Sequence, residues 1–161
     1  MEKIFTPDTK MVTGAGEVLT LEEAVQRTKN FIGDHEEFTI EVGSDSHNRD
    51  VTRVITAVVI HKIGKGGIFF HKATTYPKMK SLRDKIYTET ALSVECAQVL
   101  YEIFMDNDMF YTITIHSDIG HNGKTKDLIK EITGYVVAFG FDCYIKPDSI
   151  AASIIADKYS K

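Results

Sequence analysis

Long hydrophobic runs and cysteine are both scarce in this sequence, and each scarcity excludes a class of protein. No stretch approaches the roughly 18 apolar residues of a membrane span, and residues 1–5 carry neither a long apolar run nor a cleavage-site pattern. Cys96 and Cys143 have no His or Cys at metal-binding spacing around them. We therefore expect a soluble, cytoplasmic protein with two reduced core thiols.

Positive charge is also in short supply, since the formal net charge is -4. This net charge argues against a protein that coats nucleic acid with its whole surface. The basic residues are nevertheless concentrated. Between residues 53 and 85 the only acid is Asp84, and the bases are Arg53, Lys62, Lys65, Lys72, Lys78, Lys80, Arg83 and Lys85. Such a segment could bind a phosphate backbone, or its lysines could simply keep a solvated sheet edge from aggregating.

The 161 residues, 43% hydrophobic and 26% charged, fit one domain with a sizeable core. Residues 1–18 show no clear period and predict an irregular arm. Alternating residues predict five strands, at 38–45, 51–62, 68–75, 110–118 and 141–145. Helical signals predict four helices, from a capping box at Thr20 to Ile32, over 82–105, near 126–138, and from Pro147 onward.

Short connections make the first three strands antiparallel, and crossover helices return the later strands parallel to the first. The predicted fold class is therefore α/β. We expect a mixed five-stranded sheet with helices on both faces, plus an N-terminal helix, in a single domain of residues 1–161.

Two predicted strands end in the dipeptide Ser-Asp. The first carries Asp45 in Gly43-Ser44-Asp45-Ser46-His47, and the second carries Asp118 in His116-Ser117-Asp118-Ile119-Gly120. Side chains two apart share a face of a strand, so Asp45 falls with Glu41. If the two strands are parallel neighbours, the carboxylates of Asp45 and Asp118 meet. A divalent cation between them would be the simplest explanation of such a repulsive pair.

Two further acids fall on apolar helical stripes. Glu89 lies on the core-facing line of helix 82–105, either as a functional carboxylate or as a buried Glu bonded to a Ser, Tyr or backbone amide. Glu95 projects on the polar side and is expected to be solvated. On the last helix, Asp157 follows an apolar stripe, whereas Asp148 stands at the helix start and could simply cap it.

The loop after Asp118 contains Gly123-Lys124-Thr125, which resembles the tail of a phosphate-binding P-loop. The first glycine of that motif is missing, because Asp118 stands five residues before Gly123. We expect instead a loop at the rim of the site, where His121, Asn122 and Lys124 could touch substrate.

The element order and the placement of acids resemble the ribonuclease H-like superfamily. The segments that carry the likeness look like those of its bacterial YkuK-like branch, over roughly residues 38–161. They are Gly43-Ser44-Asp45-Ser46-His47, Lys85-Ile86-Tyr87-Thr88-Glu89, His116-Ser117-Asp118-Ile119-Gly120-His121-Asn122-Gly123-Lys124-Thr125 and Ala156-Asp157-Lys158.

The resemblance implies a two-metal phosphodiester hydrolase acting on RNA or DNA with Mg²⁺ or Mn²⁺. Its ligands would be Asp45, Glu89, Asp118 and a last-helix acid. That acid is Asp157 or Asp148, and about 13 Å of helix separates the two, so at most one can serve; we prefer Asp157.

Three histidines lie near these acids. His121 is the best placed as a proton shuttle, while His47, His116 and His121 could each equally be an ordinary surface or core imidazole.

Two other functions fit the same pattern. A catalytically inactive nucleic-acid-binding module would keep the fold without the metals, and the basic segment alone could dock RNA or DNA. A sugar-kinase or actin-like nucleotide-binding unit shares the topology, but such proteins need two halves around the nucleotide and this chain has one.

Overall fold

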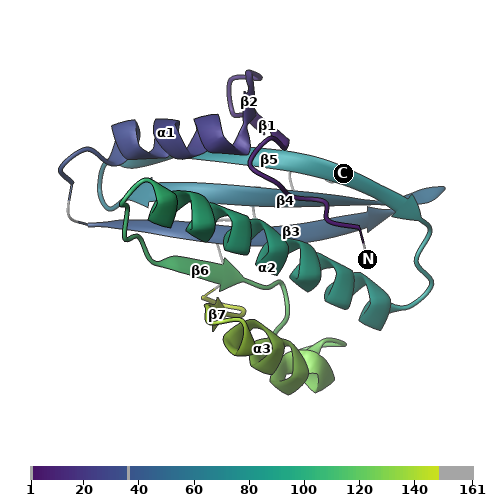
Figure 1. The fold of residues 1–161 in the computed structure, drawn as a ribbon. Helices are drawn as coiled ribbons and strands as arrows, with labels where there is room; N and C mark the ends of the chain where they lie inside the picture. Colours follow the sequence, from purple (N-terminus) through teal and green to yellow (C-terminus); the bar gives the residue numbers. More distant parts are fainter. Residues whose placement is uncertain (1, 36, 149–161) are drawn as a thin grey trace.

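The computed structural model describes residues 2–35 and 37–148. Its centre is a mixed seven-stranded sheet in the order β2-β1-β5-β4-β3-β6-β7. The strands are β1 (Lys10–Thr13), β2 (Val18–Thr20), β3 (Phe38–Asn48), β4 (Val51–Lys62), β5 (Gly66–Pro77), β6 (Ile113–His116) and β7 (Asp142–Tyr144). The helices are α1 (Leu21–Ile32), α2 (Leu82–Asp106) and α3 (Ile129–Ala138), the last preceded by the 3-10 turn η1 (Lys126–Leu128). Figure 1 shows α2 crossing the sheet.

The prediction of five strands and an irregular arm is wrong, because the N-terminal residues add a hairpin to the sheet. β1 pairs antiparallel with β2 and also with β5, where Val12 stands opposite His71. Phe5 and Met11 are fully buried, so the arm is part of the core. Strands of four and three residues are too short to show alternation, and their pairing depends on β5, far away in the sequence.

The pairing of the five expected strands is confirmed. β3, β4 and β5 form an antiparallel meander, and β6 and β7 pair parallel to β3 and β6. β4 has its predicted bounds, and β3 runs three residues beyond Asp45 to Asn48. β6 is shorter than expected, since it ends at His116, and Asp118 lies in the loop beyond it.

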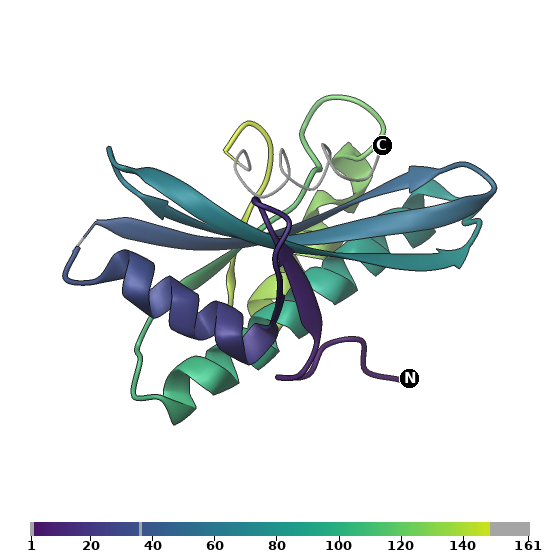
Figure 2. The same cartoon turned by 90° about the horizontal axis from the view of Figure 1, so that it is seen from above.

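The three described helices form one layer, with α1 packed against α2 and α2 against α3. Figure 2 shows α1 and α2 on the same side of the sheet. Within residues 2–35 and 37–148, the helices therefore cover one face of the sheet. The expected helices on both faces are not observed in this part of the chain. The helix expected from Pro147 onward falls on residues 149–161, outside the described part.

The predicted start of α1 is confirmed. The Glu23 amide donates to Thr20 Oγ1 at 3.1 Å, and the Thr20 amide donates to Glu23 Oε1 at 3.0 Å, which completes a capping box. Leu21 and Val25 then point into the core. Because the cap fixes where the helix begins, it also fixes which residues face the sheet.

The main core lies between the sheet and α2. Ile40 and Val42 of β3 share a cluster with Val58 of β4 and with Leu100 and Phe104 of α2. These strand residues alternate with those of the opposite face, so the register of β3 decides which polar side chains meet α2. In the described part of the chain, no helix combines the length and apolar character required to cross a membrane.

Candidate active site

β3 presents different polar groups on its two faces. Ser44 and Ser46 point toward α2, whereas Asp45 lies between them on the other face, in line with Glu41. Asp45 is half-buried and stands opposite Ile55 of β4. The expected grouping of Asp45 with Glu41 therefore follows from the pleat alone.

Glu89 meets this strand from α2. Its side chain is buried, with 7% exposure, as its place on the apolar stripe predicts. Ser46 Oγ donates to Glu89 Oε2 at 2.5 Å. One turn further along α2, Ser93 Oγ is 2.7 Å from Ser44 Oγ, which is itself 3.0 Å from Thr56 Oγ1. Hydroxyl groups thus satisfy the polar layer between β3 and α2 and hold the Glu89 carboxyl in place.

The electrostatics of Glu89 point to a crowded acidic site. Burial is the main cause that raises its pKa from 4.5 to about 8, and the hydrogen bond from Ser46 opposes this shift. The negative charges of Asp45 and Asp118 raise the pKa further, while Lys85 lowers it. Residues from β3, α2 and the loop after β6 therefore act on one another through space, although they are far apart in sequence.

Asp118 follows β6 by two residues. Gly43 pairs with His116 in the parallel ladder, so continuing the same register would place Asp118 beside Asp45. The pairing of β3 with β6 ends at His116, and the Ser117 amide donates to the Tyr144 carbonyl at 2.9 Å, which continues the contact with β7. The Asp118 carboxylate pairs with Lys146 Nζ at 2.9 Å.

The three acids are electrostatic neighbours without forming a closed ligand cluster. Among residues 2–35 and 37–148, no three His, Cys, Asp or Glu side chains are grouped closely enough to hold a metal ion. Asp157, the preferred fourth acid, lies outside the described residues. Asp148 is exposed in the turn that follows Ile145, to whose carbonyl its amide donates at 2.8 Å.

His116 is not available to solvent. It is 5% exposed, its Nε2 lies 3.1 Å from Glu41 Oε1 and 3.2 Å from Thr114 Oγ1, and its ring packs against Tyr144. Burial lowers the pKa of His116 to about 4, and burial, partly offset by His61, raises the pKa of Glu41. Burial therefore disfavours the charged forms of both groups in this contact.

The other two histidines are more accessible. His47 is half-buried near the end of β3, on the same face as Asp45, and His121 is exposed in the loop after Asp118. In that loop, Thr125 Oγ1 accepts the Gly120 amide at 3.1 Å, so the hydroxyl that a P-loop would direct to a ligand closes the loop instead.

Sequence reasoning missed three partners of this site: Ser46, Glu41 as a partner of His116, and Lys146. Strand alternation could have found the first two, since Ser46 lies on the face of Ile40 and Val42, and Glu41 on the face of Asp45. No local signal marks Lys146 as the partner of Asp118, because their contact depends on how two loops run side by side.

The solvation expected for Glu95 is wrong. Its Oε2 accepts the Ile4 amide at 2.9 Å and the Phe5 amide at 2.8 Å, and so it fastens the N-terminal arm to α2. The polar side of α2 is therefore a second contact surface, which helical periodicity alone could not distinguish from solvent exposure.

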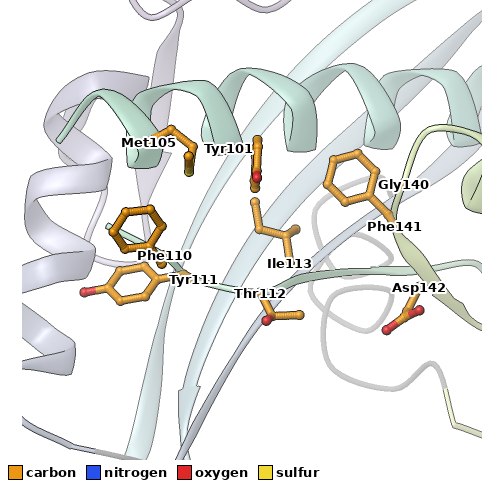
Figure 3. A pocket seen from close by; sticks show the side chains of 9 residues that line it. All are labelled: Tyr101, Met105, Phe110, Tyr111, Thr112, Ile113, Gly140, Phe141 and Asp142. Carbon is orange, nitrogen blue, oxygen red and sulfur yellow. The ribbon is translucent and has the colours of Figure 1, made fainter. Parts of the chain in front are cut away.

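A groove lies at the other end of α2. Figure 3 shows it between Tyr101 and Met105 on the helix and residues 110–113, with Asp142 at its side. Its volume is about 330 Å³, and among the described residues Asp142 is the only carboxylate that lines it. Tyr101 is twelve residues, or about 18 Å of helix, from Glu89. This groove is therefore separate from the acidic site.

Comparison with known proteins agrees with the resemblance seen in the sequence. A family model described as "Ribonuclease H-like" matches residues 23–161. The uncharacterized protein YkuK of Bacillus subtilis (strain 168) is 36% identical over 158 residues, which cover 89% of this chain and 92% of that protein. No solved structure has significant similarity to the chain.

Proposed function

The chain belongs to the ribonuclease H-like family, and on this basis we propose that it is a divalent-metal-dependent hydrolase of phosphodiester bonds in RNA or DNA. The observation that carries the proposal is the buried Glu89 carboxyl, whose pKa is raised in part by Asp45 and Asp118. Ionised carboxylates in mutual range repel one another, and a bound divalent cation removes that repulsion.

The donor chemistry suits the metals that we propose. Carboxylate oxygens are the ligands that Mg²⁺ and Mn²⁺ prefer. Asp45, Glu89 and Asp118 would hold the ions, with Asp157 as the fourth acid in the family's pattern. Two divalent ions in such a site supply Lewis-acid activation of water and stabilise charge on the leaving oxygen.

The chain's own residues hold and orient the reacting groups. Ser46 keeps the Glu89 carboxyl in one position through its hydrogen bond. The segment that carries Lys78 and Lys80 is fixed to the β3–β4 turn, because Asn48 Nδ2 donates to the Met79 carbonyl and the Met79 amide donates to Thr52 Oγ1, both at 2.8 Å. The two lysines are exposed there and bind substrate phosphates.

His121 is the proposed proton donor to the leaving oxygen. It is exposed in the loop that begins at Asp118, so it can approach a phosphate bound beside that carboxylate. His116 does not share this role, because it is buried against Glu41 and Tyr144.

Replacement of Asp45 by Asn tests the proposal. We expect Asp45→Asn to reduce Mn²⁺-dependent cleavage of RNA, DNA or a hybrid duplex by at least about a hundredfold, because it removes a ligand charge. Asp50→Asn is the matched control, since Asp50 is exposed in the turn after β3 and undergoes the same chemical change. Cleavage assays, with circular dichroism to verify folding, measure both variants.

Calorimetry gives an independent measurement on the wild-type protein. Mn²⁺ should bind to the wild type and to Asp50→Asn, and more weakly to Asp45→Asn. A folded wild type that binds no divalent ion at millimolar concentration would disprove the catalytic proposal.

A binding module without catalysis is the second candidate, and two observations favour it. Lys146 forms an ion pair with the Asp118 carboxylate. The raised pKa of Glu89 leaves its carboxyl largely protonated at neutral pH. In this case the protein binds nucleic acid equally well with and without Mn²⁺, and Asp45→Asn leaves that affinity unchanged. Cleavage by the wild type that Asp45→Asn abolishes would exclude this candidate.

A further inference from the structure

A second cleft, separate from the acidic site, opens between four parts of the chain. Its volume is about 550 Å³, within the range of small-molecule sites. The residues that line it come from the N-terminal arm, the end of β5, α2 and α3, and are Glu2, Ile4, Tyr76, Tyr87, Thr88, Ala91, Leu92, Glu95 and Tyr135. Ala91 is two residues, or 200° around the helix, from the inward-facing Glu89, so the cleft lies on another side of α2.

The wall formed by the N-terminal arm is held firmly. Glu95 accepts the amides of Ile4 and Phe5 at 2.9 and 2.8 Å, and the Phe5 side chain is fully buried in the core. Figure 1 shows the arm running beside α2. The cleft is thus bounded by a segment that a charged side chain and a buried ring fix in place.

The interior of the cleft is apolar and aromatic. Tyr76 from β5, Tyr87 from α2 and Tyr135 from α3 contribute half-buried rings, and Ile4 and Leu92 add aliphatic surface. Aromatic side chains from three different elements therefore line one cleft.

The charged residues that line the cleft are both acidic. Glu2 and Glu95 line it, and none of its nine lining residues is Lys or Arg. The Glu95 charge contributes, after burial, to raising the pKa of Tyr76, so its negative potential is felt inside the cleft. A phosphate or carboxylate ligand would meet repulsion here, whereas a cation would be attracted.

One ring of the cleft already contacts a cation within the protein. The Arg83 guanidinium lies over the Tyr87 ring, 5.0 Å from its centroid. Arg83 is itself matched by Glu131, with Nη2 and Oε2 2.6 Å apart, and the Tyr87 hydroxyl donates to the same carboxylate. The charge of Arg83 is therefore paired with Glu131 and does not neutralise Glu95.

From these features we propose that the cleft binds an organic cation, an alkylated ammonium group joined to an apolar body. The tyrosine rings contact the apolar body and attract the charge through their π-faces, and Glu95 supplies the opposite charge. This ligand site is independent of the proposed hydrolase function, because it uses none of the three acids near β3.

Choline and dimethylbutanol, its uncharged carbon isostere, separate the charge from the apolar contact. In a titration followed by NMR, choline should shift the amide resonances of Thr88, Ala91 and Glu95, and dimethylbutanol should bind at least about fivefold more weakly. Equal binding of the two probes would mean a purely apolar cleft, and shifts from neither would mean no site; either result overturns the proposal.

Glu95→Gln tests whether the negative charge of Glu95 attracts the ligand. The amide oxygen of Gln can still accept the Ile4 and Phe5 amides, so the arm stays in place while the negative charge is removed. Choline affinity should fall about fivefold in this variant. Glu102→Gln is the matched control, because Glu102 is exposed on α2 and does not line the cleft. Equal choline affinity in both folded variants would contradict the assignment.

Tyr135→Leu gives a second measurement that does not depend on Glu95. Leucine keeps apolar surface on α3 but removes the π-face. Choline should bind this variant more weakly, while dimethylbutanol should bind it as it binds the wild type. Parallel changes for both probes would mean that the aromatic ring contributes only apolar area and would refute the cation site.

Discussion

Glu89 is the residue that couples the stability of the protein to the candidate site. Its carboxyl is buried between α2 and β3, accepts a hydrogen bond from Ser46, and has a pKa raised to about 8 chiefly by burial. Burial of this acid costs little in folding energy below about pH 4.5, where the unfolded chain also holds the proton. The cost appears when the pH rises and the unfolded chain can release that proton.

The pH dependence of stability should therefore carry the signature of Glu89. Between about pH 4.5 and 8 the folded protein holds a proton that the unfolded chain has lost, so the free energy of unfolding decreases as pH rises through this window. Glu89→Gln resembles the protonated form, and in metal-free buffer it should be more stable than the wild type at pH 8, by at most a few kcal/mol. Urea unfolding at pH 5 and pH 8 measures the difference.

Glu102→Gln serves as the control for this experiment, because Glu102 is an exposed acid on the same helix. Its stability should follow the wild-type pH dependence. Parallel curves for wild type and Glu89→Gln would mean that Glu89 ionises normally in the folded protein.

At the scale of the element, α1 shows how a local signal fixes tertiary contacts. Thr20 and Glu23 cap its first turn reciprocally, and the buried residues of the helix then follow at helical spacing. Because α1 directly follows β2 and packs against α2, an error at its first turn would displace both neighbours.

Loss of this cap should destabilise the whole domain. Thr20→Ala removes the hydroxyl that accepts the Glu23 amide, and we expect the free energy of unfolding to fall by about 1 kcal/mol. Thr20→Ser retains the hydroxyl and should restore most of the loss. Urea denaturation of the three proteins measures the effect; equal midpoints for Ala and Ser would show that the hydroxyl contributes nothing.

At the scale of the molecule, the fold separates the basic residues into groups. Lys62 and Lys65 lie where β4 turns into β5, and Lys62 packs over the Phe31 ring, 4.6 Å from its centroid. Lys78 and Lys80 follow the opposite end of β5, about 36 Å away along the hairpin. Only this second group lies beside the β3–β4 turn that leads from Asp45.

Nucleic-acid binding should depend on the second group alone. Replacing Lys78 and Lys80 by Ala removes two proposed phosphate contacts, so the slope of log affinity against log salt should become shallower by about 1.5. The matched control replaces Lys62 and Lys65 by Ala. Fluorescence anisotropy with labelled RNA and DNA at several salt concentrations provides the measurement. Equal losses in both double variants would place the interface along the whole hairpin.

The sequence by itself determined the parts of the protein that depend on neighbours in the chain. The pleat period defined β3, β4 and β5, the capping box defined α1, and the helical period turned Glu89 inward and Glu95 away from the sheet. These patterns could be recognised because burial of one face imposes a fixed repeat on residues a few positions apart.

Only the tertiary structure decided what the polar groups do. It added β1 and β2 to the sheet, clamped the arm with Glu95 across about 90 residues of sequence, and paired Lys146 with Asp118. It also buried Glu41 and His116 in contact with each other. Each outcome depends on desolvation and on charges from distant segments, and these energies are set by where the folded chain brings the groups together.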